Sequence, residues 1–119
     1  EEIDAWTSFD PDNSVPEEKI ERWVAEQDGE ITGFADYMPD KNTVTGVYVH
    51  PDHLRKGIGT ALLERIIDDA RDRGLEYLEC ESSRTAREFY RSNGFHVMEE
   101  TVHRTSGEEL DAFRMRKQL

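Results

Sequence analysis

The chain is poor in cysteine and contains no long apolar run. Cys80 is the single cysteine, which excludes an internal disulfide and a zinc site built from several thiolates. No apolar run approaches the ~18 residues of a membrane span, and the N-terminal segment lacks the basic region and apolar core of a signal peptide. We therefore expect a soluble, cytoplasmic protein. Because the chain begins with Glu1 rather than Met, we also expect it to be a fragment of a longer domain.

Positive charge is scarce as well. Eleven arginines and four lysines face 27 acidic residues, which gives a formal net charge of −12. Nucleic acids and anionic membranes are bound largely through Lys and Arg, so neither is an expected partner. The acidic residues are spread along the sequence and suggest a solvated acidic coat. Our hypothesis is a salt-adapted cytoplasm, where salt screens the mutual repulsion of these charges.

The length of 119 residues suits one domain and is too short for two independent cores. Residues 1–20 contain Pro11, Pro16 and several turn-forming residues, and we interpret them as an N-terminal arm, the remnant of a helical region. At most one short helix is expected there, near 3–9. Residues 21–119 form the predicted domain. Within it, three β-rich runs separated by turn residues predict an antiparallel meander at 22–26, 31–38 and 43–49.

The period of the apolar residues lengthens after Gly57. A stripe that includes Ile58, Leu62 and Ile66 predicts a long amphipathic helix, which Gly74 ends. A short strand, a second helix and a hairpin of two strands follow, and the strand–helix–strand order permits one parallel pairing. We predict an α/β (α+β) fold with a mixed, mostly antiparallel sheet; the later elements are expected at 75–81, 86–90, 95–104 and 110–117.

The most informative segment runs from a strand into a glycine-containing loop and then directly into the long helix. The N–H groups at the helix start and the positive end of the helix dipole favour a phosphate group. Gly57 and Gly59 leave room for it, and Arg55 and Lys56 add positive charge. The dinucleotide pattern G-x-G-x-x-G fails because Leu62 stands at its third glycine, and G-x-x-x-x-G-K-[ST] is absent. The alternative is a tight strand-to-helix turn without a ligand.

Two segments together resemble the GNAT superfamily of acetyl-CoA-dependent N-acetyltransferases. Residues 47–63 resemble its motif A, [QR]-x-x-G-x-[GA] after a strand and a proline. Residues 85–95 are similar to its A-x-x-x-Y-x-x-x-G-F motif. The predicted order β-β-β-α-β-α-β-β equals the family's fold without its first strand and helix, which are expected to be missing. The resemblance also implies a central V-shaped splay in the sheet and helices on both faces.

The resemblance implies that acetyl-CoA lies in the V, as a cosubstrate and without a metal. Its pyrophosphate would meet the helix start, and its amide arm would pair with the preceding strand. Leu54 replaces the Gln or Arg of the family pattern, and Ser83 stands where many members have Asn. Ser83 could contact the pantetheine arm, or it could cap the following helix. The implied cofactor-binding residues are Val47, Tyr48, Val49, Leu54, Arg55, Lys56, Gly57, Ile58, Gly59, Thr60, Ser83 and Ala86.

By the same resemblance, Tyr90 is the candidate general acid that protonates the departing thiolate. A phenol with a pKa of about 10 stays protonated at neutral pH. The alternative is an aromatic side chain that simply packs on an amphipathic helix. Glu81 is the candidate general base. Glu79, on the same strand face, and Tyr48, His50 and Asp36 remain alternatives, as does water relaying to a carboxylate.

Two other patterns resemble metal sites but are interpreted as coincidences of an acidic surface. His50 and His53 flank a proline and an aspartate, which prevents a regular helical face and leaves no third anchored ligand. Residues 10–21 imitate a calcium loop, yet Val15 stands at its glycine position.

The expected function is transfer of the acetyl group of acetyl-CoA to a primary amine of a small molecule or peptide. A non-catalytic acyl-CoA-binding or regulatory module is the alternative, and an interaction domain without cofactor is a third option. The resemblance is compatible with a homodimer through the terminal strands.

Overall fold

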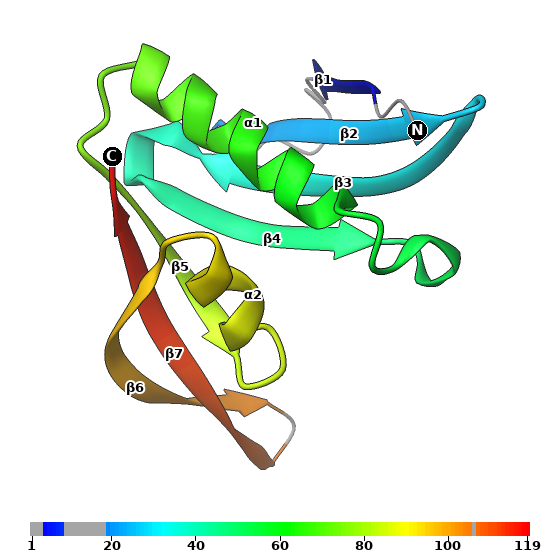
Figure 1. Cartoon of the computed structure of the whole chain (residues 1–119). Coiled ribbons are helices and arrows are strands. Elements are labelled where there is room, and N and C mark those ends of the chain that lie inside the picture. The colour runs from blue at the N-terminus through cyan, green and yellow to red at the C-terminus, as the bar shows by residue number, and fades with distance from the viewer. Residues whose placement is uncertain (1–3, 9–18, 106) are drawn as a thin grey trace.

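The computed structural model describes residues 4–8, 19–105 and 107–119. In this part, seven strands form one sheet with the order β1-β2-β3-β4-β5-β7-β6 (Figure 1). Every neighbouring pair is antiparallel except β4 and β5, which are parallel. This confirms the predicted mixed, mostly antiparallel sheet. The strands are β1 (Asp4–Ser8), β2 (Glu21–Gln27), β3 (Glu30–Met38), β4 (Thr43–Val49), β5 (Tyr77–Ser83), β6 (His96–Thr105) and β7 (Glu108–Gln118).

The predicted meander is formed by β2, β3 and β4. Asp28 and Gly29 connect the first two strands with φ of 53° and 83°, a two-residue turn that Asp-Gly favours because both positions need positive φ. A short 3-10 helix, η2 (Pro39–Lys41), leads to β4 and ends at Asn42, which also has positive φ. The turn chemistry of these residues therefore sets the connections of the meander.

The first strand is present, so the expectation that it is missing is wrong. Residues Asp4–Ser8 form β1, which pairs antiparallel with β2, in the segment where at most one short helix was expected. A five-residue segment carries little periodicity of its own, and the unpaired edge of β2 decides its conformation through ladder hydrogen bonds. Residues 9–18, which include most of the predicted arm, lie outside the described residues.

The long helix α1 (Ile58–Asp72) packs on the meander and supplies much of the core. Its apolar stripe is buried, as the sequence predicts, and Gly74 follows it with φ of 80°. Gly33 of β3 lets the helix approach closely: a Cβ there would lie 3.2 Å from Ile58 and 3.3 Å from Leu62. The second helix, α2 (Arg87–Ser92), is short and packs near β5 and β6. No helix in the described ranges is long and apolar enough to span a membrane.

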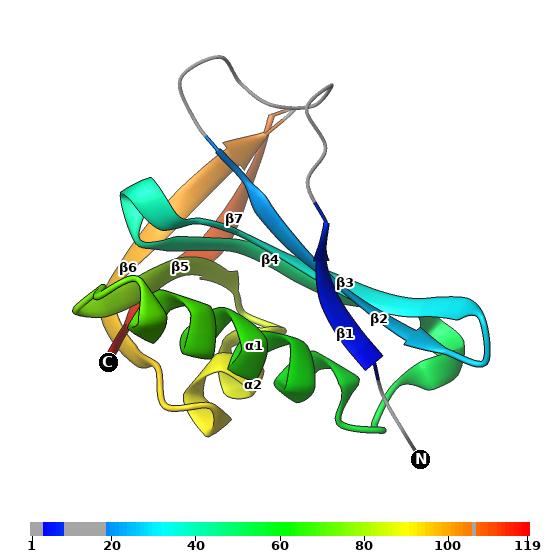
Figure 2. The ribbon, with the colours of Figure 1, turned by 90° about the horizontal axis from the view of Figure 1, so that it is seen from above.

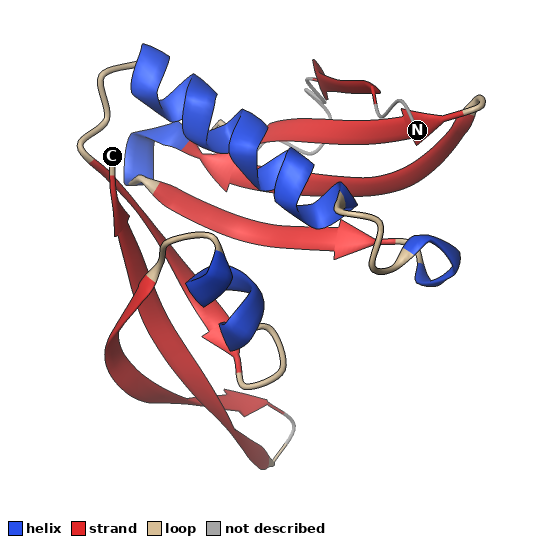
Figure 3. Ribbon diagram, viewed as in Figure 1, coloured by secondary structure: helices blue, strands red, loops and turns tan. Residues whose placement is uncertain are grey.

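Both α-helices of the described part lie on the same face of the sheet, whereas helices on both faces were expected (Figures 2 and 3). In strand β5, buried apolar residues alternate with charged ones. Leu78 and Cys80 are buried toward the helices, and Glu79 and Glu81 alternate with them on the other face. An antiparallel sheet can leave such a charged face to solvent. We call the covered side the helix face and the other side the open face.

Candidate active site

The sheet splits between its two central strands. Strands β4 and β5 pair at only two positions in the described structure, Thr43 with Glu79 and Val44 with Cys80. Beyond them the strands diverge, and Figure 1 shows the resulting V. Thr45 is an extra residue in β4, because the register with β3 shifts between Asp36 and Tyr37. A bulge bends its strand and increases its twist, so Thr45 stands where β4 turns away from β5.

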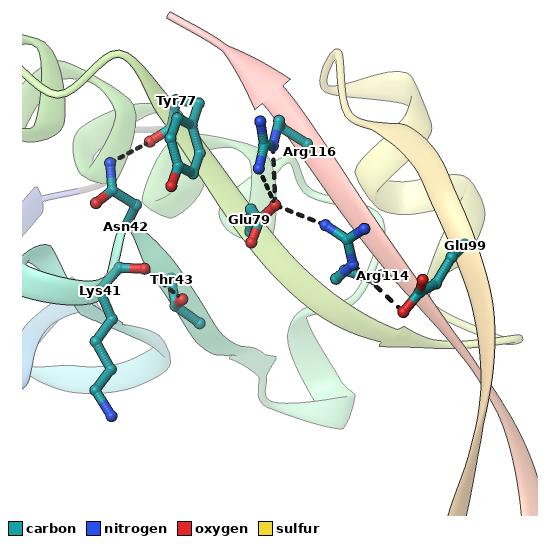
Figure 4. A network of polar contacts seen from close by, with 8 residues as sticks. All are labelled: Lys41, Asn42, Thr43, Tyr77, Glu79, Glu99, Arg114 and Arg116. Carbon is teal, nitrogen blue, oxygen red and sulfur yellow. Dashed lines mark hydrogen bonds and ion pairs between the residues drawn. The ribbon is translucent and has the colours of Figure 1, made fainter.

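The closed end of the V is held together by hydrogen bonds and ion pairs of Asn42, Glu79 and two arginines (Figure 4). The Asn42 amide donates to the carbonyl of Tyr77 at 3.0 Å, and the Glu79 N–H donates to the carbonyl of Asn42 at 2.7 Å. On the open face, one carboxylate oxygen of Glu79 accepts from Arg114 at 2.9 Å and from Arg116 at 2.8 Å. These bonds hold β5 to both of its neighbours, β4 and β7. Glu79 therefore has a structural role at this position.

The open end of the V carries the predicted phosphate loop. After β4, the 3-10 helix η3 (Pro51–His53) leads to Arg55 and Gly57, whose φ values are 64° and 77°. The first hydrogen bond of α1 runs from the Ala61 N–H to the Gly57 carbonyl at 2.9 Å. The preceding N–H groups, those of residues 58–60, have no acceptor within the helix. They lie at the positive end of the helix dipole and can bind a phosphate.

Gly57 and Gly59 are glycines for different reasons. Gly57 needs its positive φ, and a Cβ there would meet nothing within 4 Å. A Cβ on Gly59 would lie 3.1 Å from the ring of Phe89 and 3.5 Å from Val49. The structure therefore ties Gly59 to the packing of α1 against α2, whereas the sequence suggested only room for a ligand. The Asn93 amide lies 3.5 Å from the Thr60 hydroxyl and adds a second contact between these elements.

Tyr90 is 5 % exposed and lies on the helix face near Cys80. Its ring meets Phe89 and Phe95 edge to face, with centroids 5.2 and 5.5 Å away. Burial, and to a smaller extent the nearby Cys80 thiol, raises the pKa of the Tyr90 hydroxyl above its ordinary value. The packed aromatic and the proton donor are thus compatible, because burial keeps this phenol protonated.

Ser83 and Ala86 lie together in the turn between β5 and α2. The Ser83 hydroxyl accepts a hydrogen bond from the Ala86 N–H at 3.1 Å, so it stabilises the turn before α2; the N-cap of α2 is Ala86 rather than Ser83. On the other side of the V, Leu54 is 58 % exposed, and the Lys56 ammonium lies 3.5 Å from the His53 ring nitrogen. The structure therefore places the predicted loop residues on the surface around the start of α1.

The candidate bases differ in the contacts that their side chains make. Glu81 is exposed on the open face, directly opposite Arg114 in the register of β5 and β7. Asp36 accepts two hydrogen bonds from Arg22, at 2.7 and 2.9 Å. The His50 ring accepts from the Asp52 N–H at 3.1 Å, and Tyr48 packs on Phe34 with centroids 5.3 Å apart. Glu81 and Tyr90 thus lie on opposite faces of the sheet, on either side of β5.

A hollow of about 490 Å³ adjoins this end of β5, between the β5–α2 turn and the β6–β7 hairpin. Arg84 and Asp111 form an ion pair beside it. Its lining consists of Ser83, Arg84, Thr85, Glu109, Leu110 and Asp111. The lining thus contains two carboxylates, Glu109 and Asp111, and one arginine, Arg84.

Sequence reasoning missed the residues that shape the V. Thr45, Asn42 and the two arginines of β7 carry no motif, and their roles depend on strand register. The available signal was weak: Asn in a Pro-Asp-Lys-Asn turn tolerates positive φ, and alternating arginines on a predicted strand share one face. The described residues contain no group of three or more His, Cys, Asp or Glu side chains that could hold a metal. Most of the calcium-like segment 10–21 lies outside them.

Comparison with known proteins identifies the family. The chain is 47 % identical over 58 residues to L-amino acid N-acyltransferase MnaT of Escherichia coli, covering 43 % of this chain and 34 % of that protein. It is 37 % identical over 83 residues to the [ribosomal protein bS18]-alanine N-acetyltransferase of the same organism, covering 66 % and 55 %. The matched part of the chain thus covers from a third to just over half of the length of these relatives.

The structure of yncA from Salmonella typhimurium with its cofactor acetyl-CoA superposes with a TM-score of 0.69 at 32 % identity, covering 83 % of this chain and 64 % of that one. A family model described as acetyltransferase (GNAT) domain matches residues 1–119. The chain therefore belongs to the GNAT acetyltransferase family.

Proposed function

We propose that this chain transfers the acetyl group of acetyl-CoA to a primary amine of a small molecule or peptide. The observation that carries the proposal is the V between β4 and β5, which ends at a helix start whose first N–H groups have no acceptor within the helix, and which has the buried Tyr90 beside it. MnaT is named for action on L-amino acids and the bS18 enzyme for action on alanine of a ribosomal protein. These names support an amine acceptor for this chain.

The chain offers two kinds of backbone contact to acetyl-CoA. The N–H groups of residues 58–60 and the side chains of Arg55 and Lys56 would bind the pyrophosphate. The edge of β4 that faces the V, along Val47–Val49, has no β5 partner in the described structure and would pair with the amide arm as an added strand. The path between the pyrophosphate site and the edge of β4 would be lined by Leu54, Ser83 and Ala86.

In the proposed reaction the neutral amine attacks the thioester carbonyl, the C–N bond forms and the C–S bond breaks. Tyr90, which burial keeps protonated, gives its proton to the departing sulfur on the helix face. Glu81 takes a proton from the amine on the open face. The two proton transfers then occur on opposite sides of β5.

We further propose a cationic acceptor, because the chain as a whole has a net charge of −12. Two other proposals rest on the family rather than on particular contacts: a cytoplasmic location, and a homodimer through the terminal strands. Size-exclusion chromatography with light scattering checks the latter, and a monomer at all concentrations would exclude it.

The decisive experiment measures thiol release from acetyl-CoA with a panel of amines, together with the thermal shift caused by acetyl-CoA. Tyr90→Phe should lower kcat by about 10²-fold or more and leave the affinity for acetyl-CoA unchanged. Tyr77→Phe is the matched control, since it removes a phenol hydroxyl outside the V, and it should retain full activity.

Two results would contradict the proposal. Full kcat in Tyr90→Phe would remove the acid assignment. Thermal stabilisation without turnover of any amine would support the alternative, a non-catalytic acyl-CoA-binding or regulatory module. A ligand at 100 times its Kd adds about 2.7 kcal/mol of stability, so such binding is measurable even without chemistry.

A further inference from the structure

A second hollow lies on the side of α2 that faces β6, apart from the V. Its volume is about 490 Å³. Phe89 of α2 contacts Gly59 of α1, whereas Arg87 and Arg91, one turn apart, lie at this second hollow. We call it the α2–β6 groove, and its lining residues are Arg87, Arg91, His96, Val97, Glu100 and Phe113.

Arg87 is the unusual member of the groove. Its guanidinium carbon lies 4.7 Å above the centre of the Phe113 ring, and its Nε is buried without a hydrogen-bond partner among the described residues. No ion pair of Arg87 occurs in the described part of a chain that has 27 acidic residues. A buried donor without an acceptor is costly and calls for an explanation, such as a ligand or water that completes the bond.

The chemistry of the guanidinium indicates which ligand would complete it. Its N–H groups lie in one plane, where they can form paired hydrogen bonds with a carboxylate or phosphate. The contact with the Phe113 ring also restricts the motion of Arg87, so less side-chain freedom remains to be lost on binding.

The neighbours of Arg87 favour an anion. Arg91 has its charge one turn away, and its ion pair with Glu88, at 3.1 Å, is well exposed on both sides and therefore weak. The His96 ring can donate a further hydrogen bond. Glu100 is the one acidic residue in the lining. In a chain with net charge −12, this groove is a local concentration of positive charge.

We propose that the α2–β6 groove binds a small oxyanion, a carboxylate or a phosphate, with Arg87 as its main ligand. Arg91 and His96 supply further donors, and Val97 and Phe113 provide apolar walls for the carbon part of the ligand. The site is independent of the acetyl-transfer assignment, because none of these residues belongs to the loop or strands proposed for acetyl-CoA.

The test uses NMR titration of the whole chain with inorganic phosphate and, separately, with succinate, at constant ionic strength. The Nε–Hε signal of Arg87 should shift and saturate with at least one probe. Arg87→Gln should weaken binding tenfold or more, followed on the backbone signals of His96 and Val97. Arg65→Gln is the matched control, because it removes the same charge from the exposed side of α1, and it should bind like the wild type.

The outcome separates the ligand sources. Saturation by phosphate alone assigns a phosphate site, and saturation by succinate alone assigns a carboxylate site. Shifts that stay linear with both probes, equal affinity in Arg87→Gln, or equal loss in Arg65→Gln would overturn the proposal. If Arg87→Gln does not fold, Arg91→Gln replaces it, with an expected loss of threefold or more; unchanged affinity there also overturns the site.

Discussion

Gly33 should be one of the positions in this fold least tolerant of substitution. A Cβ added there would lie 2.6 Å from the backbone carbonyl oxygen of Tyr48, about 0.8 Å short of the 3.4 Å at which ordinary contact begins. It would also lie 3.2 Å from Ile58 and 3.3 Å from Leu62. Relief of the first contact requires movement of the β4 backbone, and relief of the others requires movement of α1.

We expect Gly33→Ala to lower the free energy of unfolding by about 2–3 kcal/mol, the upper part of the range for overpacked interiors. For a chain of this length, that corresponds to a fall in Tm of roughly 8–12 °C. Because β4 and the start of α1 are the elements proposed to hold acetyl-CoA, the affinity for acetyl-CoA should fall as well.

Gly46→Ala is the matched control on the neighbouring strand. A Cβ at Gly46 would meet nothing within 4 Å, and its φ is not in the left-handed region. This substitution should therefore be neutral or stabilise the fold by about 0.4–1 kcal/mol, through the lower entropy of the unfolded chain. Urea unfolding of both variants measures the difference. If Gly33→Ala is as stable as the wild type, or Gly46→Ala loses as much as Gly33→Ala, the steric argument is wrong.

Two further predictions concern pH and salt. Burial raises the pKa of the Cys80 thiol to about 12 from an ordinary 9.0, so the folded state holds this proton more tightly than the unfolded state does. The free energy of unfolding should therefore fall as pH rises from 9 to 12. This group contributes up to about 1.4 kcal/mol per pH unit to the fall. Urea unfolding between pH 8 and 10.5 should show that the free energy of unfolding falls less steeply with pH in Cys80→Ala than in the wild type. An equal dependence on pH in both proteins would contradict the raised pKa of Cys80. The excess of acidic residues predicts that Tm rises from dilute buffer to molar KCl; calorimetry that finds no rise would remove the hypothesis of salt adaptation.

Local chemistry made much of the fold predictable. Asp28 and Gly29 specify a two-residue turn, and the apolar stripe from Ile58 specifies the buried side of α1, because both signals depend on residues close in sequence. The loop around Gly57 was recognisable for the same reason. Strand β1 was not, since its conformation depends on pairing with β2 rather than on its own five residues.

The shape of the candidate site was less predictable than its residues. Glu79 and Glu81 look equivalent in the sequence, two positions apart on one strand face. Only the register of β5 with β7 shows that Glu79 is bound by both Arg114 and Arg116. Gly59 likewise looked like part of a ligand loop, and only the tertiary packing reveals its contact with Phe89. Long-range pairing determined each of these outcomes.

The divergence of β4 and β5 has a mechanical consequence. The two halves of the molecule are joined in the sheet at Thr43 and Val44, and again in the helix layer where Phe89 rests on Gly59. One joint would leave a hinge, whereas two separated joints fix the angle between the halves. A molecule that binds between the strands thus meets a gap of preset width, and none of its binding energy is needed to separate the two halves.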